Sequence, residues 1–249
     1  MKLSFFDLFI NIDNEQKYLD AIENSLLNES DQNIFYYLNS FGFYLAFKNQ
    51  LFKEALQQSD YIIPDGYSIV WAVNFLQNIV IDKVVFTYSF SPNICSVFNQ
   101  CGSRIFILGG KESELNKAIK NISEQGFSIS IAGSNHGYFS INNETDYIIE
   151  KINASHADVL IVAMGMPRSE IWIFTNKDKL HPKVIFSVGG FLSFLSGEKK
   201  IAPQWMYNSG LEWVYRLVQE PGRLWKRYLV ANIFFLSKVL MEKVSNAIK

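Results

Sequence analysis

Three segments of this chain share one order of elements: a short apolar run, a glycine turn and then a stretch with helical spacing. The apolar runs are Arg104–Leu108, Val159–Met164 and Val184–Val188. Continuous apolar strands that alternate with helices are typical of a parallel sheet with helices on both faces. Ligands of such sheets bind beyond the carboxyl ends of the strands, where these glycine turns lie. The sequence therefore predicts a binding site at that edge of the sheet.

Two further strands are expected earlier in the chain, at Phe35–Leu38 and Tyr61–Ile63. The spacing of apolar residues predicts a helix from about Phe41 to Gln57 between them and another over Tyr67–Phe75. The fold class that follows is α/β, with a Rossmann-like, mostly parallel sheet. A length of 249 residues suits one large domain of this kind with an appendage.

The C-terminal part of the chain differs from the rest in charge. Residues 197–249 carry nine Lys or Arg against four Asp or Glu, whereas residues 1–196 carry 14 against 20. Three of the five tryptophans, Trp205, Trp213 and Trp225, also lie there. We therefore divide the chain into a core, residues 1–196, and a basic, aromatic helical appendage, residues 197–249. Such a surface suits phosphates beside apolar matter, as in lipid headgroups, a lipid-linked pyrophosphate or nucleic acid.

Two helices are expected in the appendage, over Trp205–Glu220 and from about Arg223 to the end, with a break at Pro221-Gly222. On the second helix, Arg223, Lys226 and Arg227 share one face beside an apolar stripe. Two explanations stay open at this point. The helix either packs on the core with a solvated basic edge, or it binds phosphates or a membrane.

Membrane spanning is not expected, because no stretch approaches the roughly 20 consecutive apolar residues that a bilayer requires. The N-terminus makes a poor signal peptide, since Asp7 interrupts its apolar run. The two cysteines, Cys95 and Cys101, are too few for a disulfide framework and match no common zinc pattern. We expect reduced thiols in a cytosolic protein that, where it meets a membrane, lies on its surface.

Asp65 is the strongest single candidate for a catalytic residue. It follows the strand at Tyr61–Ile63 in the turn Pro64-Asp65-Gly66, where α/β enzymes place catalytic groups. Its carboxylate could act there as general base on a hydroxyl. The alternative is an Asp-Gly turn whose carboxylate caps the following helix.

Other motifs are weaker. The turn Gly109-Gly110-Lys111 offers backbone N–H groups to a phosphate, although a plain strand-to-helix turn explains it as well. Tyr138, in His136-Gly137-Tyr138-Phe139, is either a stacking platform for a base or a buried tyrosine. A dinucleotide fingerprint and a P-loop are both absent, which disfavours a dehydrogenase. No D-x-D motif occurs, so cationic side chains and amides would have to neutralise a nucleotide diphosphate.

Taken together, the motifs follow one another in a characteristic order. They are Ile63–Gly66, Phe106–Lys111, His136–Phe139, Val162–Pro167 with Glu170 and Trp172, Ala202–Met206, Gly210–Leu217, Glu220-Pro221 and Arg223–Tyr228. In these motifs the chain resembles the WecG/TagA/CpsF family of bacterial glycosyltransferases, from about Asn39 to Phe235. The segment after Ala202 is the densest part of the match.

The resemblance implies a Rossmann-like inverting glycosyltransferase that uses a UDP-sugar as donor and no metal or other cofactor. Members of the family transfer N-acetylmannosamine or a related sugar to a sugar on undecaprenyl pyrophosphate, in cell-surface polysaccharide synthesis. The expected partners are therefore a UDP-sugar, a polyprenyl-pyrophosphate-linked acceptor and the inner face of the cell membrane. Nucleic acid is not expected as a partner, and self-association stays open.

The resemblance also implies roles for single residues. Asp65 matches the catalytic base of the family, and Asn39 matches a polar pocket residue beside it. Tyr138 matches an aromatic near the uracil. The basic residues that close over the active site and engage pyrophosphate are matched by Arg216, Arg223 and Lys226. The remaining expected substrate-binding positions are Lys83, Gly109, Gly110, Gly165, Gly189 and Gly190.

Several positions depart from the family pattern. Tyr37 stands where Thr is usual, Lys83 where Arg is usual, Phe86-Thr87-Tyr88 where G-[ST]-D is usual, Ser169 where Gln is usual, Ser193 where Asp is usual, and Lys226 where Arg is usual. A lysine keeps the charge of an arginine but loses its bidentate geometry. These changes predict a divergent donor or acceptor preference. They also leave a second hypothesis, a catalytically weakened nucleotide-sugar-binding protein of a polysaccharide assembly complex, against which Asp65 and the appendage argue.

Overall fold

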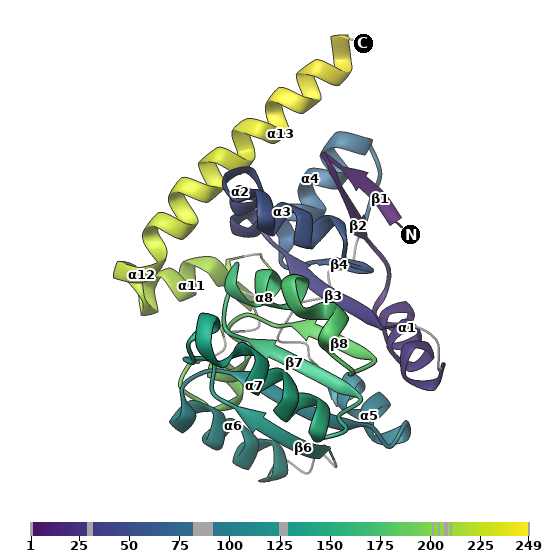
Figure 1. The fold of residues 1–249 in the computed structure, drawn as a ribbon. Helices are drawn as coiled ribbons and strands as arrows, with labels where there is room; N and C mark the ends of the chain where they lie inside the picture. The colour runs from purple at the N-terminus through teal and green to yellow at the C-terminus, as the bar shows by residue number, and fades with distance from the viewer. Residues whose placement is uncertain are drawn as a thin grey trace.

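The computed structural model describes residues 2–28, 32–81, 92–124, 129–200, 202–203, 205–206, 209 and 211–248. At its centre is a six-stranded sheet in the order β4-β3-β8-β7-β5-β6, in which every neighbouring pair is parallel (Figure 1). The strands are β3 (Asn33–Leu38), β4 (Tyr61–Pro64), β5 (Arg104–Gly109), β6 (Ser130–Asn135), β7 (Val159–Ala163) and β8 (Val184–Ser187). The prediction of an α/β, Rossmann-like parallel sheet is confirmed.

Helices cover both faces of this sheet (Figure 1). Those before the C-terminal segment are α1 (Glu15–Leu27), α2 (Ser40–Lys48), α3 (Gln50–Gln57), α4 (Tyr67–Gln77), α5 (Pro92–Gln100), α6 (Glu112–Glu124), α7 (Ile141–Ala154), α8 (Arg168–Asn176) and α9 (Phe191–Leu195), with a 3-10 turn, η2, at Lys177–Lys179. One face is packed by α1, α5 and α6, and the other by α2, α3, α4, α7 and α8. Burial on both faces explains why the strands are continuous apolar runs.

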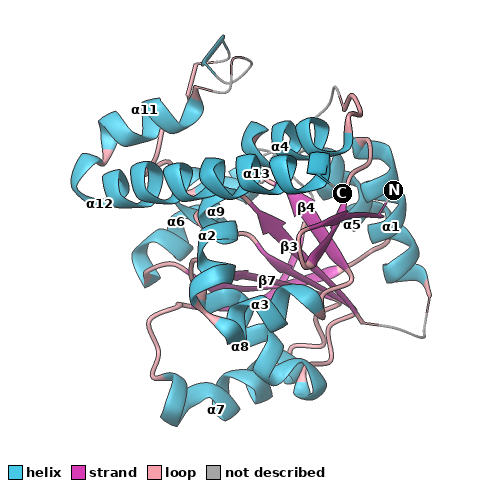
Figure 2. Cartoon of the chain, turned by 90° about the horizontal axis from the view of Figure 1, so that it is seen from above, coloured by secondary structure: helices cyan, strands magenta, loops and turns pink. Residues whose placement is uncertain are grey.

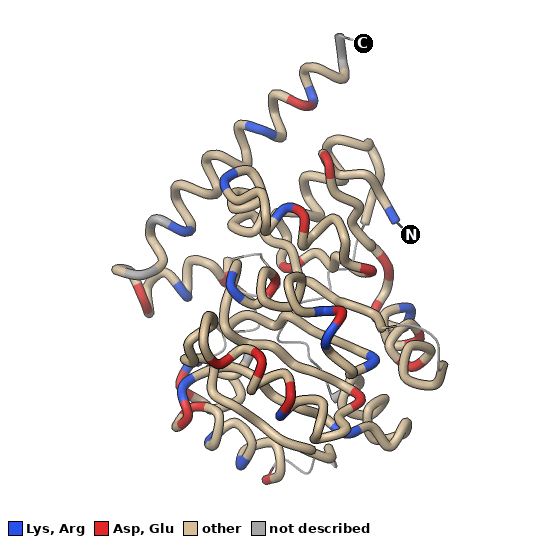
Figure 3. The backbone as a smooth tube through the Cα atoms, viewed as in Figure 1, with Lys and Arg blue, Asp and Glu red and all other residues tan. Residues whose placement is uncertain are grey.

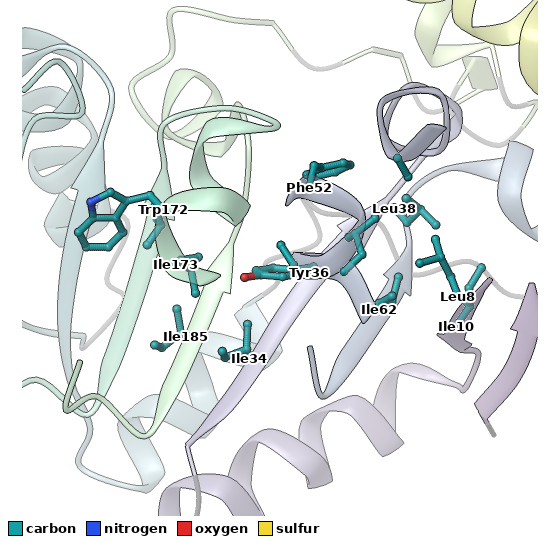
Figure 4. Packing of buried hydrophobic residues seen from close by; sticks show 14 of the residues in the cluster. Leu8, Ile10, Ile34, Tyr36, Leu38, Phe52, Ile62, Trp172, Ile173 and Ile185 are labelled. Carbon is teal, nitrogen blue, oxygen red and sulfur yellow. The ribbon is translucent and has the colours of Figure 1, made fainter. Parts of the chain in front are cut away.

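The side chains of neighbouring residues on one strand pack on opposite faces of the sheet. On β3, Tyr36 packs in one buried cluster, whereas Phe35 and Tyr37 pack in the other. Figure 4 shows part of the first cluster, in which Tyr36 lies among labelled side chains from the sheet and from α3 and α8. In the second cluster the ring of Phe35 stacks on that of Phe186, with centroids 4.8 Å apart. The sheet is thus the shared wall of two apolar layers.

The helix expected between β3 and β4 is in fact two helices, α2 and α3, which meet at Asn49. The Asn49 side chain accepts a hydrogen bond from the Phe52 N–H at 3.0 Å and so caps the second helix. Asparagine competes with helical hydrogen bonding in this way, which is why the periodicity alone did not reveal the break.

Two β elements lie outside the strands predicted from the sequence. The first is an antiparallel hairpin of β1 (Lys2–Phe5) and β2 (Leu8–Asn11). The second is the edge strand β6, with the sequence SIAGSN, which pairs with β5 only and is half-buried along most of its length. An edge strand need not be apolar on both faces, so a search for apolar runs passes over it.

Beyond α9 the chain forms α11 (Glu212–Gln219), α12 (Pro221–Trp225), a π-helical turn η3 (Lys226–Val230) and α13 (Ala231–Ile248). Trp205 and Met206 are helical, as expected, but Ser209 lies in a turn and α11 begins only at Glu212, so the expected single helix is interrupted. The expected break is confirmed, and Pro221 opens α12, which suits a residue that has no N–H to donate. The division of the chain at residue 197 stays a prediction.

The helix α13 lies across α2 and α4 (Figure 2). Its Phe235 is buried and meets Phe43 edge to face, with ring centroids 5.1 Å apart. Near its end, Lys243 Nζ donates to the Phe75 carbonyl at 2.6 Å. The basic positions of α13 lie at intervals along the helix (Figure 3). This helix therefore packs on the core with one face, while Ile233 and Leu240 on it stay exposed.

Substitution of Gly109, at the end of β5, tests the close approach of β5 to β7 through its effect on stability. Its φ is +156°, and an added Cβ would lie 2.4 Å from the Ala163 carbonyl oxygen on β7. We expect Gly109→Ala to lower the free energy of unfolding by about 2 kcal/mol or more, because a backbone clash between paired strands cannot relax cheaply.

The matched control is Gly222→Ala on α12, where an added Cβ meets nothing within 4 Å. This change is expected to leave stability unchanged or raise it by up to about 1 kcal/mol. Urea denaturation of both variants measures the difference. Equal midpoints for the two would contradict the strand-end geometry.

Candidate active site

A cavity of about 790 Å³ lies at the carboxyl edge of the sheet. Each of the six strands contributes a lining residue within two positions of its end. In chain order these are Asn39, Asp65, Gly110, Gly137, Gly165 and Gly189. Parallel strands bring all their carboxyl ends to one edge, so residues far apart in the sequence meet here.

The C-terminal helices line the same cavity from the other side. They contribute Glu212, Trp213 and Arg216 from α11, Arg227 and Tyr228 from η3, and Asn232 and Leu236 from α13. A hydrogen bond of 2.5 Å from Ser40 Oγ to Asn232 Oδ1 joins α2 to α13 at its margin. The cavity is therefore built jointly by the sheet edge and by the C-terminal segment.

Asp65 is held in this cavity by Asn39. The Asn39 Nδ2 donates to Asp65 Oδ2 at 3.1 Å. The Asn39 Oδ1 accepts from the Gly42 N–H at 3.0 Å and caps α2, which fixes the direction of the side-chain amide. The Asp65 N–H also donates to the Leu38 carbonyl at 2.8 Å. Backbone and side chain together orient the half-buried carboxylate toward the space above the sheet edge.

Tyr37 lies beside this pair and lines the cavity. Burial raises the pKa of its phenol, and the nearby charge of Asp65 raises that pKa further. The phenol is therefore neutral at physiological pH and can donate a hydrogen bond. Tyr37 is one of the positions that departs from the family pattern, and it stands next to the candidate base.

Glu170 is a second carboxyl in the cavity wall, and its sequence motif predicted no role for it. It is 1% exposed, and its Oε1 accepts from Ser187 Oγ at 2.7 Å. Its Oε2 has no hydrogen-bond partner among the described residues. Burial raises the pKa of this carboxyl, while Ser187 and the charge of Arg227 act in the opposite direction.

Glu212 brings a third carboxyl to the cavity from the first turn of α11. Its Oε1 lies 3.8 Å from Arg216 Nη1. Burial and then the charge of Asp65 raise the pKa of Glu212 to about 7, although Arg216 acts in the opposite direction. The same Asp65 charge acts on the pKa of Tyr228, which burial raises. The candidate base and the C-terminal helices are thus electrostatically coupled.

Arg227 attaches the C-terminal helices to the core through an aromatic ring. Its guanidinium lies 4.4 Å from the centroid of the Phe41 ring on α2. A cation over an aromatic face is stabilised by the ring quadrupole, most strongly where water is excluded. Trp213 and Tyr228 meet nearby, with ring centroids 6.0 Å apart.

Most of the residues singled out from the sequence come together here. The described ones that line the cavity are Asn39, Asp65, Gly110, Tyr138, Gly165, Gly189, Gly190 and Arg216. Gly109 does not line it, since its backbone faces Ala163. Lys83 and Tyr88 lie outside the described residues, and so do the side chains of Arg223 and Lys226.

Tyr138 and two positions that depart from the family pattern, Ser193 and Ser169, differ in their exposure to the cavity. Tyr138 is 69% exposed at the cavity rim, so the alternative of a buried tyrosine is wrong. Ser193 Oγ donates to Glu114 Oε1 inside the cavity. Ser169 is fully buried, and its hydroxyl accepts from the Met164 N–H at 3.0 Å instead of lining the cavity.

Comparison with known proteins now identifies the family. The profile of the glycosyl transferase WecG/TagA/CpsF family matches residues 4–249. The chain belongs to this family of glycosyltransferases. The cavity at the sheet edge is therefore the candidate active site of a glycosyltransferase, and the resemblance proposed from the sequence motifs is confirmed.

Two named relatives are similar to this glycosyltransferase over most of its length. A Bacillus subtilis protein is 29% identical over 231 residues, which cover 92% of this chain and 88% of the relative. A Staphylococcus aureus protein is 28% identical over 90% of this chain and 87% of its own length. Both are named N-acetylglucosaminyldiphosphoundecaprenol N-acetyl-beta-D-mannosaminyltransferase.

Metal binding was expected to be absent from this glycosyltransferase. Within the described part of the chain, no group of three or more His, Cys, Asp or Glu side chains is arranged to hold a metal ion. Metal independence stays a prediction.

Glu212 is expected to make the stability of the enzyme depend on pH. Its pKa is about 7 in the folded state against 4.5 for an ordinary glutamate. Between these values the folded state binds more protons than the unfolded state, so the free energy of unfolding falls as pH rises and levels off above pH 7. Removing this carboxyl with Glu212→Gln should therefore favour the folded state more at pH 8 than at pH 5, by about 1–3 kcal/mol.

Urea denaturation at the two pH values measures this difference. The control is Glu150→Gln, at an exposed position of α7 outside the cavity. A stability change for Glu212→Gln that is the same at pH 5 and pH 8 would contradict the assignment of a raised pKa to Glu212.

Proposed function

We propose that this glycosyltransferase transfers N-acetylmannosamine, or a closely related sugar, from a UDP-sugar to a sugar carried on undecaprenyl pyrophosphate. The observation that carries the proposal is the pairing of Asn39 with Asp65 in a cavity that cationic residues of the C-terminal helices also line. The names of the relatives support the choice of donor sugar and acceptor. A volume of about 790 Å³ is within the range of small-molecule sites.

Asp65 acts in this proposal as the general base. Its carboxylate takes the proton of the acceptor hydroxyl while that oxygen attacks the anomeric carbon of the donor. The bond from the anomeric carbon to the diphosphate breaks on the opposite face, so the configuration at that carbon inverts. Asn39 serves to position the carboxylate, because its amide is fixed by the start of α2.

The leaving diphosphate needs its charge neutralised. Arg216 lines the cavity, and guanidinium groups bind phosphate oxygens with two parallel hydrogen bonds. Fixed cations and backbone amides in a site that excludes water stabilise a developing negative charge more strongly than water does. These groups would replace a metal ion, and Tyr138 at the rim would stack on the uracil. No observation favours the alternative of a weakened binding protein.

Replacement of the base tests the mechanism. Asp65→Asn is expected to lower transfer 10²–10⁴-fold, since the amide keeps the size of the side chain and its acceptor for Asn39 but takes up no proton. UDP affinity and the unfolding midpoint should stay at the wild-type values. UDP release with UDP-N-acetylmannosamine and a synthetic lipid-pyrophosphate acceptor measures transfer.

Asp146→Asn on α7 is the control, since Asp146 is exposed and pairs with Lys179 outside the cavity. Wild-type turnover by Asp65→Asn would end the general-base assignment. Binding of UDP without transfer by the unaltered enzyme, across a panel of UDP-sugars, would instead favour the binding-protein alternative.

The acceptor is a membrane lipid, so we propose that the enzyme works on the cytoplasmic surface of the membrane. No helix in the described segments is both long and apolar enough to cross a bilayer. Ile233, Leu240 and Val244 on α13 are 69%, 53% and 59% exposed, and they share one face at helical spacing. An amphipathic helix with such a face lies in the headgroup region of a membrane.

The triple variant Ile233→Gln/Leu240→Gln/Val244→Gln tests this surface. Loss of three apolar side chains is expected to weaken binding to anionic phospholipid vesicles about tenfold or more in a sedimentation assay. Activity on a short-chain, water-soluble acceptor should not change, because these residues do not line the cavity. The control is Leu27→Gln, at an exposed apolar position at the end of α1. Equal vesicle binding by the triple variant and the wild type would exclude this surface.

A further inference from the structure

Two cations converge on the glycine turn that follows β8. A Cβ atom at Gly190 would lie 3.8 Å from Lys199 Nζ and 3.9 Å from Arg216 Nη2. Lys199 comes from the loop after α9, where its N–H donates to the Ser193 carbonyl at 2.9 Å, whereas Arg216 comes from α11. Both side chains line the cavity. Since Gly190 has no side chain, the space between the turn and the two cations is accessible to a ligand.

Each of these cations faces a carboxylate near one end of α11. Lys199 Nζ lies 3.5 Å from Glu220 Oε1, and Arg216 Nη1 lies 3.8 Å from Glu212 Oε1. Charge-assisted hydrogen bonds are shorter, about 2.7–2.9 Å, so both contacts are loose ion pairs. A ligand with more negative charge and better geometry can displace a carboxylate from such a pair.

We propose that Lys199 binds the diphosphate of the donor, and that the diphosphate takes the place of Glu220 on Lys199 when it binds. This inference rests on the proposed function, because it assumes a nucleotide diphosphate as donor. A diphosphate carries more charge than one carboxylate and has several acceptor oxygens, so it can engage Lys199 and Arg216 together beside the Gly189-Gly190 turn. Lys199 is not among the basic residues that the sequence motifs single out.

The competing explanation is structural. The pair of Lys199 and Glu220 could only fasten the loop after α9 to the end of α11, with no ligand involved. The two explanations differ in what removal of Glu220 does. If the pair is only structural, removal of Lys199 and removal of Glu220 break the same contact and have the same effect. If Glu220 is instead a counter-ion that the ligand displaces, it competes with the ligand for Lys199, so its removal increases ligand affinity.

Isothermal titration with UDP and with inorganic pyrophosphate separates these cases. Lys199→Met is expected to weaken the affinity for both ligands about tenfold or more, as loss of a hydrogen bond to a charged group does. Glu220→Gln is expected to bind both more tightly than the wild type. The control Lys200→Met removes the same charge one residue away, from an exposed side chain outside the cavity, and should bind as the wild type does.

Wild-type affinity in Lys199→Met overturns the proposal, and so does wild-type or weaker binding by Glu220→Gln. Thermal unfolding midpoints show whether each variant is folded, and the Glu220→Gln result alone is decisive if Lys199→Met does not fold. If pyrophosphate binds in a way that depends on Lys199 but UDP does not bind, the anion site at Lys199 is supported and the proposal of a UDP-sugar donor is rejected. UDP binding that is equal in the wild type and Lys199→Met would keep the proposed function and reject the role of Lys199.

Discussion

The parallel register between β3 and β4 is the constraint on which the active site depends. Leu38 is aligned with Pro64, so the next residues, Asn39 and Asp65, leave the sheet side by side. Their hydrogen bond of 3.1 Å follows from that alignment. A shift of one residue would turn every side chain of the strand to the other face. Each face of β3 packs in its own buried cluster, so such a shift would force both clusters to repack, and this holds the register.

Charge balance in the cavity links this site to the C-terminal helices. Among the described residues, four lining side chains are acidic, Asp65, Glu114, Glu170 and Glu212, and four are basic, Arg168, Lys199, Arg216 and Arg227. A bound diphosphate would leave such a cavity with excess negative charge. Burial raises the pKa of both Glu170 and Glu212, and the pKa of Glu212 reaches about 7. Protonation of Glu212 leaves the cavity with a net positive charge for the phosphates.

The sequence predicted those features of the fold and of the site that depend on local residue patterns. Apolar runs and glycine turns placed most of the strands of the parallel sheet, and the turn at Asp65 predicted a functional group at a strand end. The polar edge strand β6 and the helix break at Asn49 were missed, because neither carries an apolar signal. The roles of Glu212 and Lys199 depend on how the chain returns over the sheet edge after α9. Nothing in the spacing of residues records that path, so only the structure brings these side chains to the cavity.

The described positions that depart from the family pattern differ in whether their side chains reach the cavity. Ser169 bonds to the backbone at the end of β7 and does not reach the cavity, so its effect is on the loop that it braces. Ser193 is inside the cavity, and its hydroxyl donates to Glu114, so that the carboxyl charge at this place is carried by Glu114. Tyr37 stands next to the pair of Asn39 and Asp65, where it lines the cavity with a bulky neutral phenol that can donate a hydrogen bond. Of the described departures, Tyr37 is thus the one that combines size, a hydrogen-bond donor and proximity to the candidate base.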